Sequence, residues 1–123
     1  MKITKSYLRK NPNHIFVFGD NLQRKGKGGA SKLRDEPNTY GFITKKAPNN
    51  NSGSFYKPEE YEIKFESELK NLIKQIEKNP DKTFFISKLG GGLANKYNIY
   101  EKIIKPGLER LKEYENVEFL EED

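Results

Sequence analysis

The chain contains no cysteine, no tryptophan and a single histidine among its 123 residues. Without cysteine it forms no disulfide and has no thiolate nucleophile. One histidine without cysteine argues against a zinc site, so we expect no metal and no cofactor. No apolar run approaches the roughly 20 residues of a membrane span, and no signal-peptide pattern opens the chain. We therefore expect a soluble, cytoplasmic protein with no membrane partner.

The length predicts one domain, residues 1–123, with a core of its own. The 8 Phe and 7 Tyr argue against disorder. The net charge of +5 favours polyanions as partners, either nucleic acid or small phosphate esters. Much of the excess of lysine occurs with glutamate in the expected helices, which is typical of solvent-exposed helix faces. It bears on function where basic residues border the glycine-rich segments, at Arg24, Lys25, Lys27, Lys45, Lys46 and Lys88.

Two glycine-rich segments each follow an apolar run that reads as a buried strand. Residues 20–31 follow the run 14–18, and residues 87–95 follow the run 83–86. A strand that ends in a glycine turn and opens a helix presents bare backbone N–H groups and the positive end of the helix dipole. Two such loops on neighbouring strands predict two sides of one anion-binding crevice. The open alternative is that the glycines only make turns.

The remaining pattern alternates strands and helices. A long helix begins at Pro58 and ends before Asn79, and a second helix is capped by Asn98 and divided by Pro106. Further strands are expected at 40–44 and 117–120, a short edge strand at residues 3–4, a short helix at 30–34 and a polar loop at 45–57. The order predicts an α/β fold with a mixed, largely parallel sheet flanked by helices.

The common phosphate-binding motifs do not fit the first glycine segment. Six residues separate Gly19 from Gly26, where a P-loop requires four, and Gly28 replaces the hydroxyl residue that would hold magnesium. The dinucleotide fingerprint requires a glycine where this chain has Ser31.

The two segments instead resemble the glycine loops of macro domains. Asn21-Leu22 with the glycine run 26–30 resembles the first loop, and residues 89–93 resemble the second. The spacing from Arg34 to Lys45 also looks like a little-described bacterial and phage group of macro-like proteins. The resemblance covers roughly residues 14–112 and implies a compact three-layer domain.

The resemblance implies binding of an ADP-ribose-type, NAD-derived nucleotide between the loops, including sequestration of a cyclic signalling derivative as in phage anti-defence. A phage-encoded copy would act in the host cytoplasm. The implied ligand-binding residues are Asp20, Asn21, Gly26, Gly28, Gly29, Ala30, Thr44, Lys88, Gly90, Gly91, Gly92 and Leu93.

Two other functions stay open. One is hydrolysis of an ADP-ribosyl bond, with Asp20 as the candidate residue to orient or activate water. The other is nucleic-acid binding by the basic surface. Asp20 is equally readable as a turn cap and as a contact to ribose hydroxyls or an amine. Asn21 could also satisfy loop backbone, but the resemblance to macro domains favours a ribose contact, and His14 is read as structural. The chain is expected to be a monomer or a small homo-oligomer.

Overall fold

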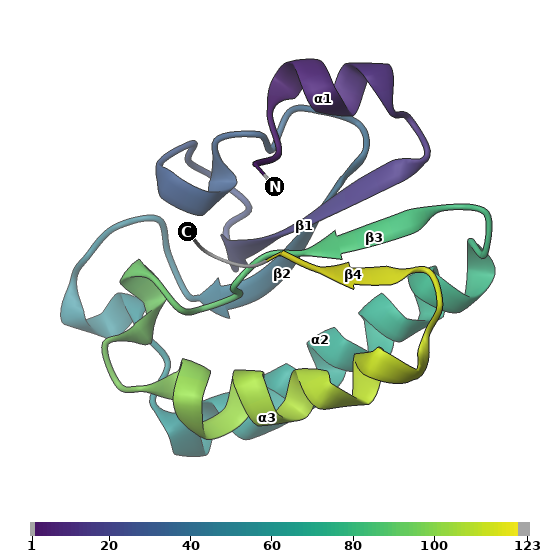
Figure 1. Ribbon diagram of the computed structural model, residues 1–123. Helices are drawn as coiled ribbons and strands as arrows, with labels where there is room; N and C mark the ends of the chain where they lie inside the picture. Colours follow the sequence, from purple (N-terminus) through teal and green to yellow (C-terminus); the bar gives the residue numbers. More distant parts are fainter. Residues whose placement is uncertain (1, 121–123) are drawn as a thin grey trace.

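The computed structural model describes residues 2–120 as a four-stranded parallel sheet with helices on both faces (Figure 1). The strands are β1 (His14–Asn21), β2 (Thr39–Lys45), β3 (Thr83–Ile86) and β4 (Val117–Phe119), in the order β2-β1-β3-β4. Every paired strand in this part of the chain is parallel. The expected α/β architecture is confirmed.

One face of the sheet carries the larger core. Helix α2 (Pro58–Lys78) covers it together with a helical segment made of a π-helical turn (Tyr100–Ile104), α3 (Lys105–Leu108) and a 3-10 turn (Glu109–Glu113). The apolar stripe of α2 includes Phe65, Leu69 and Leu72, all at most 2% exposed. The expected break at Pro106 is confirmed, because the segment changes helix type around that residue.

The opposite face carries a smaller core around Leu8, Leu33 and Phe85. Helix α1 (Lys5–Lys10) lies here, and the edge strand expected at residues 3–4 is wrong. Thr4 instead caps this helix, since its Oγ1 accepts a hydrogen bond from Tyr7 N at 3.1 Å. The helix expected at 30–34 is also wrong, because only a 3-10 turn (Gly29–Ser31) forms.

The outer edge of β2 is closed by side chains from α2. Glu68 accepts a hydrogen bond from Ile43 N at 2.6 Å, and the Tyr61 hydroxyl donates to Ile43 O at 2.5 Å. Both side chains are buried. At Ile43, therefore, the edge of β2 has no backbone group left to pair with another strand.

Strand β1 continues three residues beyond the expected end at Phe18. Gly19 permits this, because a Cβ there would lie 3.3 Å from Thr44 Oγ1 and 3.7 Å from Gly90 N. The ends of β1, β2 and the loop after β3 thus pack against one another. No helix within residues 2–120 has the length and apolar character to cross a membrane.

Candidate functional site

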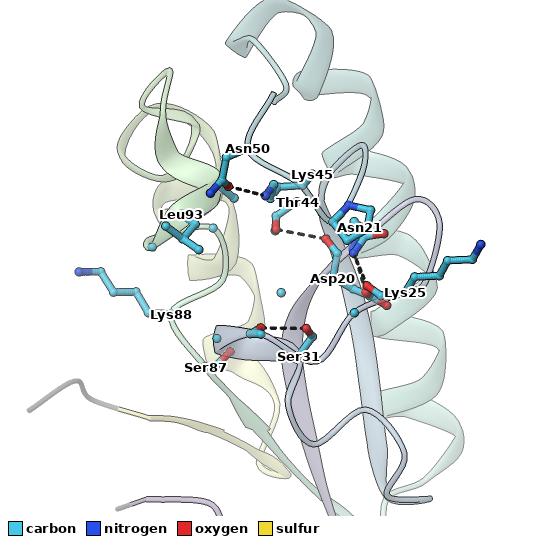
Figure 2. Close-up of a pocket in the computed structure, with 18 of the residues that line it drawn as sticks. Asp20, Asn21, Lys25, Ser31, Thr44, Lys45, Asn50, Ser87, Lys88 and Leu93 are labelled. Atoms are coloured by element: carbon cyan, nitrogen blue, oxygen red, sulfur yellow. Dashed lines mark hydrogen bonds between the residues drawn. The ribbon is translucent and has the colours of Figure 1, made fainter. Parts of the chain in front are cut away.

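A pocket of about 560 Å³ opens at the carboxyl ends of β1, β2 and β3 (Figure 2). The chain leaves β1 toward the face of α1, where Leu33 is buried, and leaves β3 toward the face of α2, where Leu89 and Ile104 are buried. Two neighbouring parallel strands whose connections diverge in this way leave a crevice between them, which is the usual ligand position in open α/β sheets.

Both glycine-rich segments line this pocket. The side chain of Ala30 lies outside the described part of the chain, and every other residue implied by the resemblance lines the pocket except Gly91. Gly91 packs under the Lys88 side chain, since a Cβ there would lie 2.7 Å from Lys88 Cγ. The two glycine-rich segments therefore lie on one pocket, as the sequence predicts.

Other lining residues were not predicted as ligand contacts: Phe16, Gly19, Lys25, Ser31, Lys45, Pro48, Asn50, Ser87 and Ala94. Lys25 and Lys45 carried a signal, because they stand beside the glycine segments in a basic chain. Phe16 carried none, because it reads as one of several apolar residues in a buried strand. Pro48 and Asn50 come from the polar loop after β2, which forms the third wall of the pocket.

Backbone N–H groups from both loops remain unpaired at the pocket. Those of Gly28, Gly90 and Gly92 have no hydrogen-bond acceptor among residues 2–120. Gly90 adopts φ +74°, and a Cβ there would clash with Ile104, so both its conformation and its surroundings require glycine. The expected helix dipole is absent, because single 3-10 turns, Gly29–Ser31 and Leu93–Asn95, follow the two loops. The donors are individual amides.

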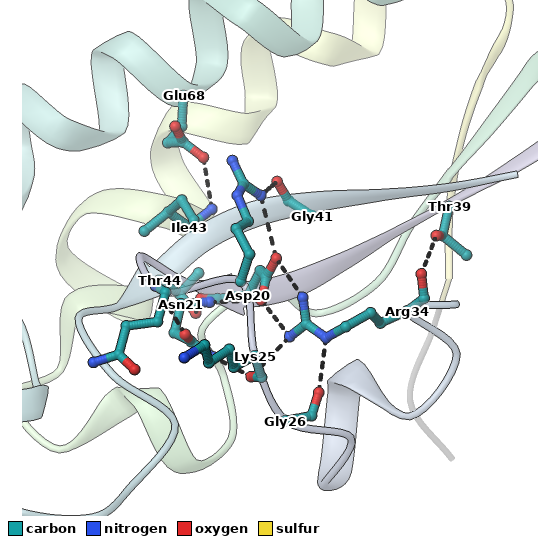
Figure 3. A network of polar contacts seen from close by, with 12 residues as sticks. Asp20, Asn21, Lys25, Gly26, Arg34, Thr39, Gly41, Ile43, Thr44 and Glu68 are labelled. Atoms are coloured by element: carbon teal, nitrogen blue, oxygen red, sulfur yellow. Dashed lines mark hydrogen bonds and ion pairs between the residues drawn. The ribbon is translucent and has the colours of Figure 1, made fainter. Parts of the chain in front are cut away.

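Asp20 is the centre of an ion-pair network rather than a free carboxylate (Figure 3). Arg34 Nη2 lies 2.6 Å from Asp20 Oδ1 and Arg34 Nη1 lies 3.1 Å from Oδ2, a bidentate pair. Arg24 Nη1 adds a third contact at 3.2 Å and also donates to Gly41 O at 2.7 Å. The Asp20 side chain is only 1% exposed.

Through Arg34, this network shapes the first glycine loop. Arg34 Nε donates to Gly26 O at 2.7 Å, and Nη2 donates to Lys25 O at 3.0 Å. The same side chain stacks over the Phe18 ring at 5.5 Å. Asp20 therefore positions Arg34, and Arg34 fixes the backbone of the loop that lines the pocket.

Asn21 and Thr44 also hold the backbone beside the pocket. Asn21 Nδ2 donates to Lys25 O at 2.8 Å, and its Oδ1 accepts from Gln23 N at 3.1 Å. Thr44 Oγ1 donates to Asp20 O at 3.4 Å. Asn21 thus satisfies loop backbone, which is the turn-forming role that the sequence left open for it.

Asn95 caps the helical segment after the second loop, so the prediction of Asn98 is wrong. Asn95 Oδ1 accepts from Tyr100 N at 2.9 Å, and its Nδ2 donates to Glu101 at 2.9 Å. Asn98 instead takes a positive φ of 62°. This cap fixes the chain that leaves the second loop.

Most of the charged side chains among the described lining residues are basic. Lys25, Lys45 and Lys88 line the pocket, and Asp20, already paired with two arginines, is the sole carboxylate among the described lining residues. Figure 2 shows Lys25 and Lys88 on opposite flanks, with Lys45 and Asn50 together between them. Lys45 Nζ lies 3.4 Å from Asn50 Oδ1. Burial lowers the pKa of Lys45, because the ammonium has lost part of its water.

Metal binding finds no support in this part of the chain. Residues 2–120 contain no group of three or more His, Asp or Glu side chains placed to hold an ion. His14 lies at the amino end of β1, away from the pocket at the carboxyl end, and its Nδ1 is hydrogen-bonded to the Tyr7 hydroxyl at 2.7 Å. Its role is structural in this geometry.

Comparison with known proteins identifies the family. Residues 1–97 match a family of unknown function, DUF7831, and no curated protein or solved structure matches the chain. The matched residues include β1, β2, β3 and both glycine loops, so the whole pocket lies within them. Because the match covers well over half of the sequence, the chain belongs to the DUF7831 family, whose function is unknown.

Proposed function

We propose that this protein binds an ADP-ribose-type nucleotide in the pocket between the two glycine loops. The observation that carries the proposal is the set of unpaired backbone N–H groups at Gly28, Gly90 and Gly92, contributed by both loops to one pocket. Backbone amides of this kind are suited to phosphate oxygens, because hydrogen bonds to an ionised acceptor are shorter and stronger than neutral ones.

Charge and size agree with a phosphorylated small molecule. Lys25 and Lys45 beside the pocket favour an anion, and Asp20, the one carboxylate among the described lining residues, is paired with Arg24 and Arg34. The volume of about 560 Å³ lies within the range of about 300–1,000 Å³ typical of small-molecule sites. The resemblance of both loops to those of macro domains supports ADP-ribose as the ligand class.

Binding without turnover fits the geometry better than hydrolysis. A general base needs a lone pair directed at water, and both Asp20 carboxylate oxygens already accept hydrogen bonds from arginines. No other carboxylate or histidine among the described residues lines the pocket. Sequestration of an NAD-derived signalling nucleotide, useful to a phage against a host defence, is the role we propose for such binding.

Isothermal titration with ADP-ribose, a cyclic ADP-ribose isomer and a short oligonucleotide tests this function. Each ligand is then released by denaturation and analysed for breakdown. We expect an ADP-ribose compound to bind and to be recovered intact. Recovery of a cleaved product would replace binding with hydrolysis. Binding of the oligonucleotide alone, weakening steeply with salt, would make the protein a nucleic-acid binder.

A further inference from the structure

The wall of the pocket formed by Lys45 continues into a cluster of cations and aromatic rings. Lys45 Nζ lies 4.9 Å and Lys96 Nζ lies 5.3 Å from the centre of the Phe55 ring. Lys96 Nζ also lies 5.8 Å from the centre of the Tyr97 ring, and Lys57 Nζ lies 6.0 Å from it. We call Lys45, Phe55, Lys57, Lys96 and Tyr97 the Phe55 cluster.

The Phe55 cluster concentrates positive charge. None of its three lysines forms an ion pair with a carboxylate in residues 2–120. The neighbouring carboxylate of Glu60 is paired with Lys46 Nζ at 2.7 Å. Lys45 Nζ and Lys96 Nζ both lie within 5.3 Å of the centre of the Phe55 ring. The two charges are therefore separated by no more than about one Debye length, roughly 10 Å. An anion bound between them would relieve their repulsion.

The Phe55 cluster is continuous with the pocket and shielded from solvent at its base. Lys45 itself lines the pocket, and Ala94, which precedes Lys96 by two residues, lines it from the second glycine loop. Phe55 is only 6% exposed and forms a backbone bridge with Lys45. The Phe55 ring thus holds two ammonium groups near each other, one from the end of β2 and one from Lys96, directly after the 3-10 turn that follows the second loop.

We propose that the Phe55 cluster is a second anion subsite that holds a phosphoryl group beyond the diphosphate of the nucleotide. This inference rests on the proposed binding of an ADP-ribose-type ligand between the glycine loops. The loop amides hold the diphosphate, and Lys45 and Lys96 hold the additional phosphate by charge-assisted hydrogen bonds. The ligand class is therefore a nucleotide with at least three phosphoryl groups.

Isothermal titration of the whole protein with two pairs of ligands tests the inference. The pairs are ADP-ribose against ADP-ribose 2′-phosphate, and ADP against ATP. We expect the additional phosphate to tighten binding at least tenfold in one pair, since a hydrogen bond to a charged group is worth about one to two factors of ten. The variant Lys96→Gln should reduce that advantage below about threefold, while its affinity for ADP-ribose stays within about threefold of the unmodified chain.

The variant Lys74→Gln is the matched control. It removes the same charge from an exposed position of α2, about 25 Å along the helix from Lys57, and should keep the full advantage. Equal affinity within both pairs, with ADP-ribose bound, would overturn the subsite and leave the proposed function intact. Failure of all four nucleotides to bind would overturn both. Tight binding of a single-stranded oligonucleotide alone, lost in Lys96→Gln, would assign the cluster to a nucleic-acid backbone instead.

Discussion

Substitution of Gly28 by alanine separates a ligand-binding role of the first loop from a folding role. Gly28 has φ −83° and ψ 149°, an extended conformation open to any residue, and a Cβ there would meet nothing within 4 Å. The new methyl group therefore fits the free protein. We expect the free energy of unfolding to stay the same or to rise by about 0.4–1 kcal/mol, because alanine restricts the unfolded chain.

Ligand binding should respond differently, because a Cβ keeps a phosphate away from the backbone amide. Loss of one hydrogen bond to a charged oxygen costs about 1.5–3 kcal/mol, which corresponds to a dissociation constant about 10- to 150-fold higher. Titration calorimetry with ADP-ribose measures the affinity, and urea denaturation measures the stability. Gly53→Ala is the control, because its Cβ also meets nothing within 4 Å and Gly53 does not line the pocket.

An affinity of the Gly28→Ala variant within twofold of the unmodified chain would refute the reasoning for this loop. The ligand phosphates would then not approach the backbone at Gly28. Equal weakening by Gly53→Ala would refute it as well, since the effect would not be local to the pocket.

Three further predictions concern stability, each measured by urea denaturation. Asp20→Asn should cost about 3 kcal/mol, because it leaves the Arg34 guanidinium, 14% exposed, without its carboxylate; a cost under 0.5 kcal/mol would refute the network. Gly41→Ala should cost about 1–3 kcal/mol, because its Cβ would clash with Asp20; an unchanged midpoint would contradict this contact. Tyr61→Phe should cost about 1–2 kcal/mol at pH 7, because Ile43 O loses its buried donor. Burial raises the pKa of Tyr61 above its unfolded value of about 10, so its contribution is complete below pH 10 and declines above it. The alkaline decline should be smaller in Tyr61→Phe than in the unmodified chain, and equal declines would contradict the assignment.

The parts of the fold with continuous local signals could be predicted from the sequence. The strand at 83–86 and the helix that begins at Pro58 form as expected, because apolar spacing and capping chemistry act within each segment. Helix α1 escaped prediction because it buries Leu8 alone, which leaves no periodic stripe to recognise. The last residues of β1 escaped because Gly19-Asp20-Asn21 has the composition of a turn.

The candidate site was predictable as a pair of loops and not as a set of contacts. The glycine runs gave the position of the pocket, since the carboxyl ends of parallel strands meet at one edge. The engagement of Asp20 by Arg34, 14 positions later, depends on how the intervening loop folds back. The position of Asn50 at the pocket and the position of Lys96 over the Phe55 ring likewise depend on tertiary packing, which no local pattern encodes.

Amide chemical-shift mapping by NMR during titration with ADP-ribose tests the central claim most directly, because it observes the proposed backbone donors themselves. We expect saturable shifts that are largest at the amides of Gly28, Gly90 and Gly92, with α2 little affected. Absence of shifts at saturating ligand, or shifts confined to exposed lysines outside the pocket, would contradict the account.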